Sequence, residues 1–112
     1  MAAPIFFNVP RALDYLLKNG FVYTARVHSE QNHAERIRTV RRGSYFHFRT
    51  YGSAVVTYIR ECNSYDIEEF VEHSGFDSLE EWRTTLTRIH GIIPTMDLLK
   101  VELIREPNTK KE

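Results

Sequence analysis

The stretch Ser44-Tyr-Phe-His-Phe-Arg-Thr-Tyr-Gly-Ser-Ala-Val-Val-Thr-Tyr-Ile-Arg60 decides the fold. Aromatic and β-branched residues are typical of strands, and they fill residues 44–49 and 54–60. Between them lies Thr50-Tyr-Gly-Ser53, where the glycine suits the positive φ of a hairpin turn. The pattern predicts two antiparallel strands joined by a turn at residues 50–53.

The residues before this hairpin predict a helix and then a strand. Leu13, Leu16 and Leu17 recur at helical spacing, and Gly20 is placed to end a helix of about residues 9–19. Residues 21–27 are aromatic and β-branched, as in a strand. Residues 28–43 are polar and predict a loop that ends in a short strand around residues 36–40.

The residues after the hairpin predict two helices and a last strand. The first helix covers residues 66–73, with Gly75 as its terminator. The second begins at Ser78, which forms a capping box with Glu81, and this helix continues as far as Gly91. Residues 98–105 alternate apolar and polar side chains, which is typical of a half-exposed strand. Together these elements predict an α+β fold, a small mixed or antiparallel β-barrel with flanking helices.

Length and composition favour one small domain. A chain of 112 residues with 42% hydrophobic residues suits a single core, so we expect one domain over residues 1–106 and a flexible tail over 107–112. The lone Cys62 allows no internal disulfide, and the amino-terminal residues resemble neither a signal peptide nor a membrane span. We therefore expect a cytoplasmic protein that does not bind membranes.

Charge is divided unevenly along the chain. Residues 1–60 carry nine basic and three acidic residues, whereas residues 61–112 carry six basic and twelve acidic residues. This division can build a basic face that attracts phosphates, although the two halves could equally neutralise each other across the fold. The densest basic run comprises Arg36, Arg38, Arg41 and Arg42.

Several of these segments resemble a known family. The order of elements, the stretch Ser74-Gly-Phe-Asp-Ser-Leu-Glu-Glu-Trp82, Ile89-His-Gly91, the closing Leu99-Lys-Val-Glu-Leu103 and the loop Arg41-Arg-Gly43 resemble archaeal-type ASCH domains over about residues 8–105. The resemblance implies a barrel of the PUA-like superfamily with an RNA-binding cleft. Some bacterial members are amidohydrolases that deacetylate N4-acetylcytidine.

The family signature, Gly-x-Lys-x-x-Glu/Thr-x-Arg, maps onto the predicted strand 21–27. Its end coincides with Thr24 and Arg26, which the resemblance makes ligand-facing residues. Its lysine, part of the catalytic set in the deacetylating members, corresponds to Phe21, and its glycine to Asn19. This departure favours a binding domain over an enzyme, and we assign no catalytic residue.

The predicted function is binding of RNA or a nucleotide in a basic cleft. Single-stranded RNA is held by stacking bases on exposed rings beside a positive groove. Tyr45 is the stacking candidate, whereas Phe46 and Phe48 alternate like interior residues and Trp82 shares a helix face with apolar residues. The predicted nucleic-acid-binding residues are Thr24, Arg26, Arg36, Arg38, Arg41, Arg42, Tyr45 and Arg49.

Two other functions remain open at this level. One is hydrolysis of an amide on a modified nucleoside such as N4-acetylcytidine, and the other is a protein-interaction module acting through the acidic helices. No cofactor is expected. No metal site is expected either, because the five histidines show no recognised ligand spacing and one thiol does not complete a zinc site.

Overall fold

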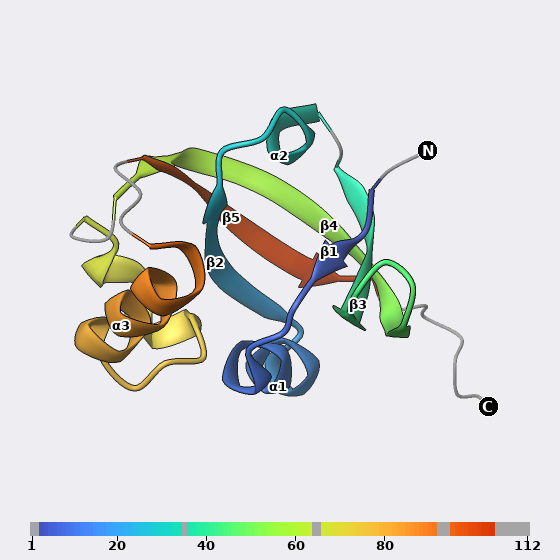
Figure 1. The fold of residues 1–112 in the computed structure, drawn as a ribbon, viewed down its shortest axis with the longest axis horizontal. Helices are drawn as coiled ribbons and strands as arrows, with labels where there is room; N and C mark the ends of the chain where they lie inside the picture. The colour runs from blue at the N-terminus through green and yellow to red at the C-terminus, as the bar shows by residue number, and fades with distance from the viewer. Residues whose placement is uncertain (1–2, 35, 64–65, 92–94, 105–112) are drawn as a thin grey trace.

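One curled sheet forms the centre of the molecule. The computed structural model describes residues 3–34, 36–63, 66–91 and 95–104. In them, five strands follow the order β1-β3-β4-β5-β2 and curl into a half-barrel (Figure 1). β1 pairs with β3 in parallel, and the other neighbours are antiparallel. The strands are β1 (Ile5–Phe6), β2 (Phe21–Val27), β3 (Ile37–Gly43), β4 (Phe48–Cys62) and β5 (Met96–Leu103).

Helical segments flank this sheet, so the predicted α+β class is confirmed. They are α1 (Pro10–Asn19), α2 (Gln31–Ala34), the 3-10 helix η1 (Glu68–His73) and α3 (Leu79–His90). α1 matches its prediction and ends at Gly20, whose φ of 87° lets its N–H donate to the Leu16 carbonyl at 2.8 Å. The expected helix at 66–73 is a shorter 3-10 helix. None of the described helices is long and apolar enough to cross a membrane.

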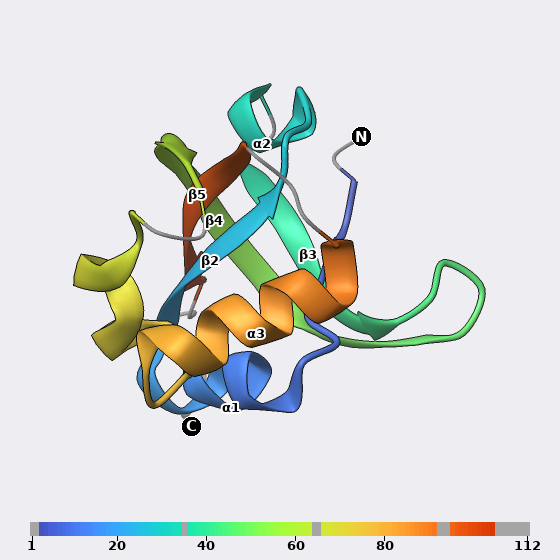
Figure 2. The ribbon, with the colours of Figure 1, turned by 60° about the vertical axis from the view of Figure 1, so that its left-hand side comes forward.

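The central hairpin differs from its prediction. Its loop lies at residues 44–47, between β3 and β4, and the expected turn at residues 50–53 is part of β4. Gly52 has a φ of 131°, but it serves a β-bulge: Val40 pairs with Gly52 and Arg41 with Thr50, which leaves Tyr51 as the extra residue. A glycine inside a strand pattern can mark a bulge as well as a turn. The hairpin projects from the body of the molecule (Figure 2).

Two apolar clusters fill opposite faces of the sheet. In the first, Leu13 and Leu16 of α1 pack with residues that include Val22 and Val101. In the second, Trp82 of α3 packs with residues that include Ala25, Leu98 and Met96. Because β5 contributes to both clusters, Met96 to Leu99 are all buried. The predicted alternation is present from Leu99 to Glu102, where Leu99 and Val101 are buried, Lys100 is half-buried and Glu102 is exposed. The strand begins two residues earlier than expected, and its first residues, Met96 to Leu98, are buried on both faces.

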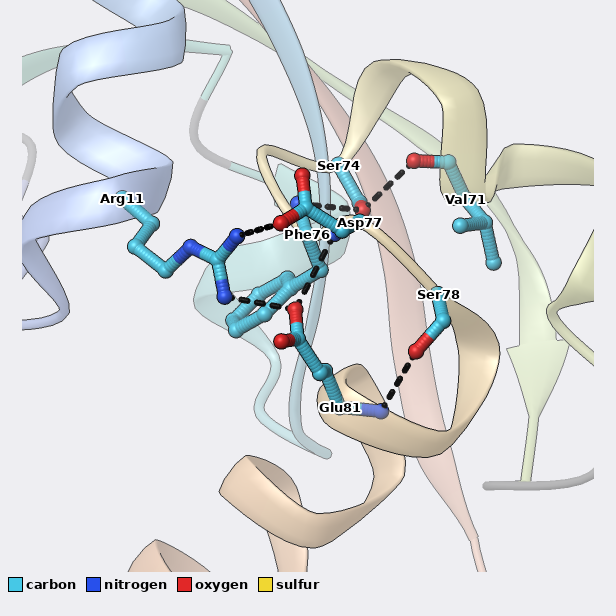
Figure 3. Close-up of polar contacts among 7 residues, drawn as sticks. All are labelled: Arg11, Val71, Ser74, Phe76, Asp77, Ser78 and Glu81. Atoms are coloured by element: carbon cyan, nitrogen blue, oxygen red, sulfur yellow. Dashed lines mark hydrogen bonds and ion pairs between the residues drawn. The ribbon is translucent and has the colours of Figure 1, made fainter.

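A polar junction fixes the start of α3 against α1 (Figure 3). The predicted cap is present, since the Ser78 hydroxyl accepts from the Glu81 amide at 3.1 Å. The expected return bond from Glu81 goes elsewhere: its carboxylate accepts from the Asp77 amide at 3.2 Å and from Arg11 at 2.5 Å. Arg11 also pairs with the Asp77 carboxylate. Gly75 is required here, because a Cβ would lie 2.7 Å from the Arg11 carbonyl oxygen.

Candidate nucleic-acid interface

A pocket of about 220 Å³ lies between the two edge strands of the half-barrel, and we call it the seam pocket. Residues 6–9 line one side, residues 24–26 of β2 the other, and α1 and α3 complete it. The walls are mostly apolar, with Phe76 and Trp82 stacked at 6.2 Å between ring centroids. The polar groups come from Asn8, Thr24, Arg26 and Thr85. Apolar walls with a few converging polar groups are typical of small-molecule sites.

The predicted pair Thr24 and Arg26 does meet in this pocket. Both side chains lie on one face of β2, and Arg26 Nε donates to Thr24 Oγ1 at 3.0 Å. Arg26 Nη1 donates to the Phe6 carbonyl at 2.6 Å, so it bridges the two edges of the sheet. Its guanidinium also lies over the Phe7 ring, 4.6 Å from the centroid. Within the described chain these bonds leave Arg26 Nη2 as a donor for a ligand.

Arg26 carries a charge that the described chain does not neutralise. No carboxylate among the described residues lies within ion-pair distance of it. Burial, and to a lesser extent repulsion from Arg38, lowers the pKa of Arg26 from 12.5 to about 10. The side chain therefore stays protonated at neutral pH at a cost in solvation. An anionic group in the seam pocket would offset that cost.

A second candidate surface is the hairpin tip, which we define as residues 42–49. Tyr45 is 65% exposed and Phe46 is 90% exposed, while Arg42 and Arg49 are also exposed. The prediction that Phe46 and Phe48 fill the barrel interior is wrong. Their alternation was read as belonging to a strand inside the sheet, but Phe46 lies in the projecting loop and Phe48, 44% exposed, opens β4.

Two arginines at or beside the tip lie over aromatic rings. The Arg41 guanidinium lies 3.9 Å from the centroid of the Phe48 ring, and that of Arg49 lies 5.4 Å from the Tyr51 ring. Such cation–π contacts hold a guanidinium in place without consuming its charge. The tip therefore presents fixed positive groups beside rings that solvent can reach.

The residues Phe6 and Asn8 join the seam pocket to the hairpin tip. The Phe6 carbonyl accepts from Arg26, and the Phe6 ring contacts that of Tyr45 edge to face at 5.2 Å. Asn8 exchanges two hydrogen bonds with the backbone of Gly43, of 3.0 and 2.7 Å. Both residues also line the pocket. The two candidate surfaces are thus contiguous.

Two of the predicted arginines do not join this surface. Arg38 is only 7% exposed, and it donates to the carbonyls of Ala3 and Pro4 and to Asn32 Oδ1 at 2.9–3.2 Å. The expectation that it faces a nucleic acid is corrected, because burial commits its donors to the protein. Arg36 is exposed but precedes β3, roughly 20 Å along the strand from the tip.

Groups suited to acid–base catalysis are missing from the described lining of the seam pocket. That lining contains no carboxylate, imidazole or lysine. Phe21 packs against Tyr15, Tyr23 and His73. Cys62 is buried, and burial raises the pKa of its thiol to about 11, which keeps it protonated.

Sequence reasoning missed one cluster, formed by His28, His33 and Asp97. Their ligand atoms all lie within 4.8 Å of one another. Asp97 is fully buried at the start of β5, while the two histidines lie around α2. The histidines are five residues apart, but Asp97 follows 64 residues after His33, so no local motif marks the set. The pairing of β2 with β5 brings His28 near Asp97, and the packing of α2 on β4, where the His33 ring meets that of Tyr58, adds His33.

Comparison with known proteins adds no family assignment: no protein-family model, no curated protein and no solved structure matches this chain.

Proposed function

We propose that the protein binds single-stranded RNA, with part of one nucleotide in the seam pocket and the adjoining bases on the hairpin tip. The observation that carries this proposal is the continuity of the two surfaces through Phe6, which contacts both Arg26 and Tyr45. An anion site beside a stacking platform suits a single polynucleotide strand, which carries phosphates and unpaired bases along its length.

Each surface supplies one part of the recognition. In the pocket, Arg26 Nη2 offers a charged donor to a phosphate or to a base edge, and Thr24, Asn8 and Thr85 add neutral polar groups. A volume of about 220 Å³ is below the roughly 300–1,000 Å³ of sites for drug-sized ligands, so the pocket has room for one part of a nucleotide, its base or its phosphate, with the rest outside. At the tip, Tyr45 and Phe46 offer rings for unpaired bases, and Arg42 and Arg49 offer charge to the backbone.

The test is fluorescence anisotropy of a labelled single-stranded RNA in a salt series. Contacts from Arg26, Arg42 and Arg49 to three phosphates predict a slope of log K against log salt near −2, since each contact on a single strand contributes about −0.7. Replacing Arg42 and Arg49 by glutamine should reduce that slope to about −0.7. Lys18→Gln is the matched control, because Lys18 is exposed at the far end of α1 from the pocket-lining Val9 and Ala12.

Mononucleotides separate the two surfaces. A mononucleotide reaches only the seam pocket. Arg26→Met should therefore weaken the binding of both the RNA and the mononucleotide, whereas the Arg42→Gln, Arg49→Gln variant should weaken the binding of the RNA alone. Absence of salt-sensitive RNA binding by the unaltered protein would refute the proposal. Equal RNA affinity of Lys18→Gln and the Arg42→Gln, Arg49→Gln variant would remove the hairpin tip from it.

A further inference from the structure

Asp97 is a buried carboxylate that two imidazoles approach from different elements. His28 Nδ1 lies 3.1 Å from Asp97 Oδ1, and His33 Nε2 lies 3.5 Å from Asp97 Oδ2. The side chain of Asp97 is completely buried, while those of His28 and His33 are 59% and 39% exposed. The cluster is therefore anchored in the sheet by its acid and opens to solvent through its histidines.

The distances match those of a metal coordination shell. Zinc bonds of roughly 2.0–2.1 Å to nitrogen and oxygen place tetrahedral ligand atoms about 3.3 Å apart. The separation of His28 Nδ1 from Asp97 Oδ1 is 3.1 Å, and that of His33 Nε2 from Asp97 Oδ2 is 3.5 Å. One ligand atom from each of the three residues lies within 4.8 Å of the others, so a metal ion can reach all three once they close in slightly. Two imidazoles and one carboxylate are also the ligand types of zinc sites that keep one position for solvent.

Surrounding groups hold the carboxylate in a fixed orientation. Asp97 Oδ2 accepts from Asn32 Nδ2 at 2.8 Å and from the Ser29 amide at 3.2 Å. Asn32 is itself held by Val27 and by the buried Arg38. Oδ1 carries one further contact, the hydrogen bond with His28 Nδ1 at 3.1 Å. Because a carboxylate offers about four lone-pair positions, a cation bound by His28 Nδ1 would take the place of this hydrogen bond at Oδ1. Groups that orient a ligand in this way are a regular part of metal sites.

The histidines are held as well. The His33 ring packs on Tyr58, with 3.9 Å between the ring centroids, and the His28 ring meets that of His33 edge to face at 5.4 Å. Glu30 and Glu61 lie close enough to add negative potential at His28. A cation would find three ligand atoms, an oriented carboxylate and an attractive field, with an open approach from solvent.

We propose that His28, His33 and Asp97 form a binding site for a divalent transition metal of the zinc type, with a fourth position open to solvent. Zinc suits this set because it accepts imidazole and carboxylate ligands in tetrahedral geometry. The metal would join α2 to β5, two segments that the sequence separates by more than sixty residues. The site is separate from the seam pocket, whose lining contains none of the three residues.

Binding is tested on the full chain, stripped of metal with a chelator and titrated with Zn²⁺ by calorimetry. One equivalent should bind, and His28→Gln or His33→Gln should each weaken binding by about 100-fold. Loss of a residue that only orients a metal ligand weakens metal affinity by roughly 10–100-fold, and loss of a ligand itself should cost at least as much. His47→Gln is the matched control, since His47 is an exposed imidazole of the hairpin tip outside the cluster. Unchanged affinity in both cluster variants, or no stoichiometric binding by the unaltered chain, would overturn the proposal.

Two further measurements keep the result independent of folding defects. Co²⁺ in place of Zn²⁺ should give the visible absorption of a tetrahedral site with the unaltered chain and His47→Gln, but not with His28→Gln. Saturating Zn²⁺ should raise the Tm of the unaltered chain and of His47→Gln, because a metal that binds only the folded state stabilises it. Equal Zn²⁺ stabilisation of the His28→Gln, His33→Gln double variant would count against the site. Asp97→Asn is avoided because it alters a buried hydrogen-bonded group.

Discussion

Two arginines, the half-buried Arg26 and the buried Arg38, lie in different regions of the sheet. Around Arg38, the carbonyls of Ala3 and Pro4 and the Asn32 side chain receive hydrogen bonds from all three of its nitrogens. Around Arg26, the Phe6 carbonyl and the Thr24 hydroxyl receive two, and the neighbouring space is the seam pocket. The sequence around each arginine does not show which of the two keeps a donor for a ligand.

The difference shows what a buried guanidinium does when its surroundings change. Arg38 is enclosed by acceptors and ties the amino-terminal segment to α2, so it stabilises the fold. Arg26 lies between the Phe7 ring and the seam pocket, so its Nη2 remains a donor for a ligand. Its pKa, lowered by burial, reflects a charge that the protein only partly compensates.

The largest expected effect is on stability, and it separates these two arginines. Arg38→Met should lower the free energy of unfolding by about 3 kcal/mol, because three acceptors, the buried Asn32 side chain and two half-buried carbonyls, lose their donor together. Arg26→Met should cost about 1 kcal/mol, since fewer acceptors are lost. Urea denaturation followed by fluorescence of Trp82 measures both. Equal losses in the two variants would break the distinction.

A second prediction concerns the backbone that supports the hairpin tip. A Cβ at Gly43 would lie 2.2 Å from the His47 carbonyl oxygen and 2.9 Å from the Phe48 Cα, so Gly43→Ala should cost about 2 kcal/mol. Gly52→Ala is the matched control: its φ is also positive, at 131°, but nothing lies within 4 Å of the added carbon. We expect about 1 kcal/mol there, from backbone strain alone. Thermal denaturation of the two variants compares them.

Local sequence patterns predicted most elements because their causes are local. The α1 boundary follows from Gly20, β2 follows from its own β-branched residues, and the α3 cap follows from Ser78. The predicted position of the hairpin turn was wrong because a glycine such as Gly52 suits a turn and a bulge equally. Which of the two forms depends on how β4 pairs with β3. That pairing is a tertiary property.

The candidate site divides in the same way. Thr24 and Arg26 could be paired from the alternation of one strand, whereas the role of Arg38 depends on acceptors contributed by Ala3, Pro4 and Asn32. The side of the pocket formed by α3 and residues 6–9 was not predicted, because apolar residues carry no signal that distinguishes a pocket wall from a core. The Asp97 cluster was hidden by sequence distance.

The smallest effect on stability is expected at Phe46, where the effect on binding should still be clear. This side chain is 90% exposed, so Phe46→Ser should change the free energy of unfolding by less than about 0.5 kcal/mol. Loss of one stacking ring should lower the affinity for RNA by about tenfold, which lies within the roughly 1–3 kcal/mol measured for base–aromatic contacts. Anisotropy with the RNA and with a mononucleotide separates the two surfaces, because the mononucleotide affinity should not change.

Ile37→Ser supplies the control for that experiment. Ile37 is 59% exposed at the opposite end of β3, so its replacement removes exposed apolar surface without touching the hairpin tip. If both variants weaken RNA equally, the effect arises from general surface hydrophobicity. If only Phe46→Ser weakens RNA binding, the exposed ring acts as a stacking platform. The aromatic residues then divide as the two arginines do: Arg38 donates all of its hydrogen bonds within the protein, whereas Arg26 and Phe46 keep groups that a ligand can contact.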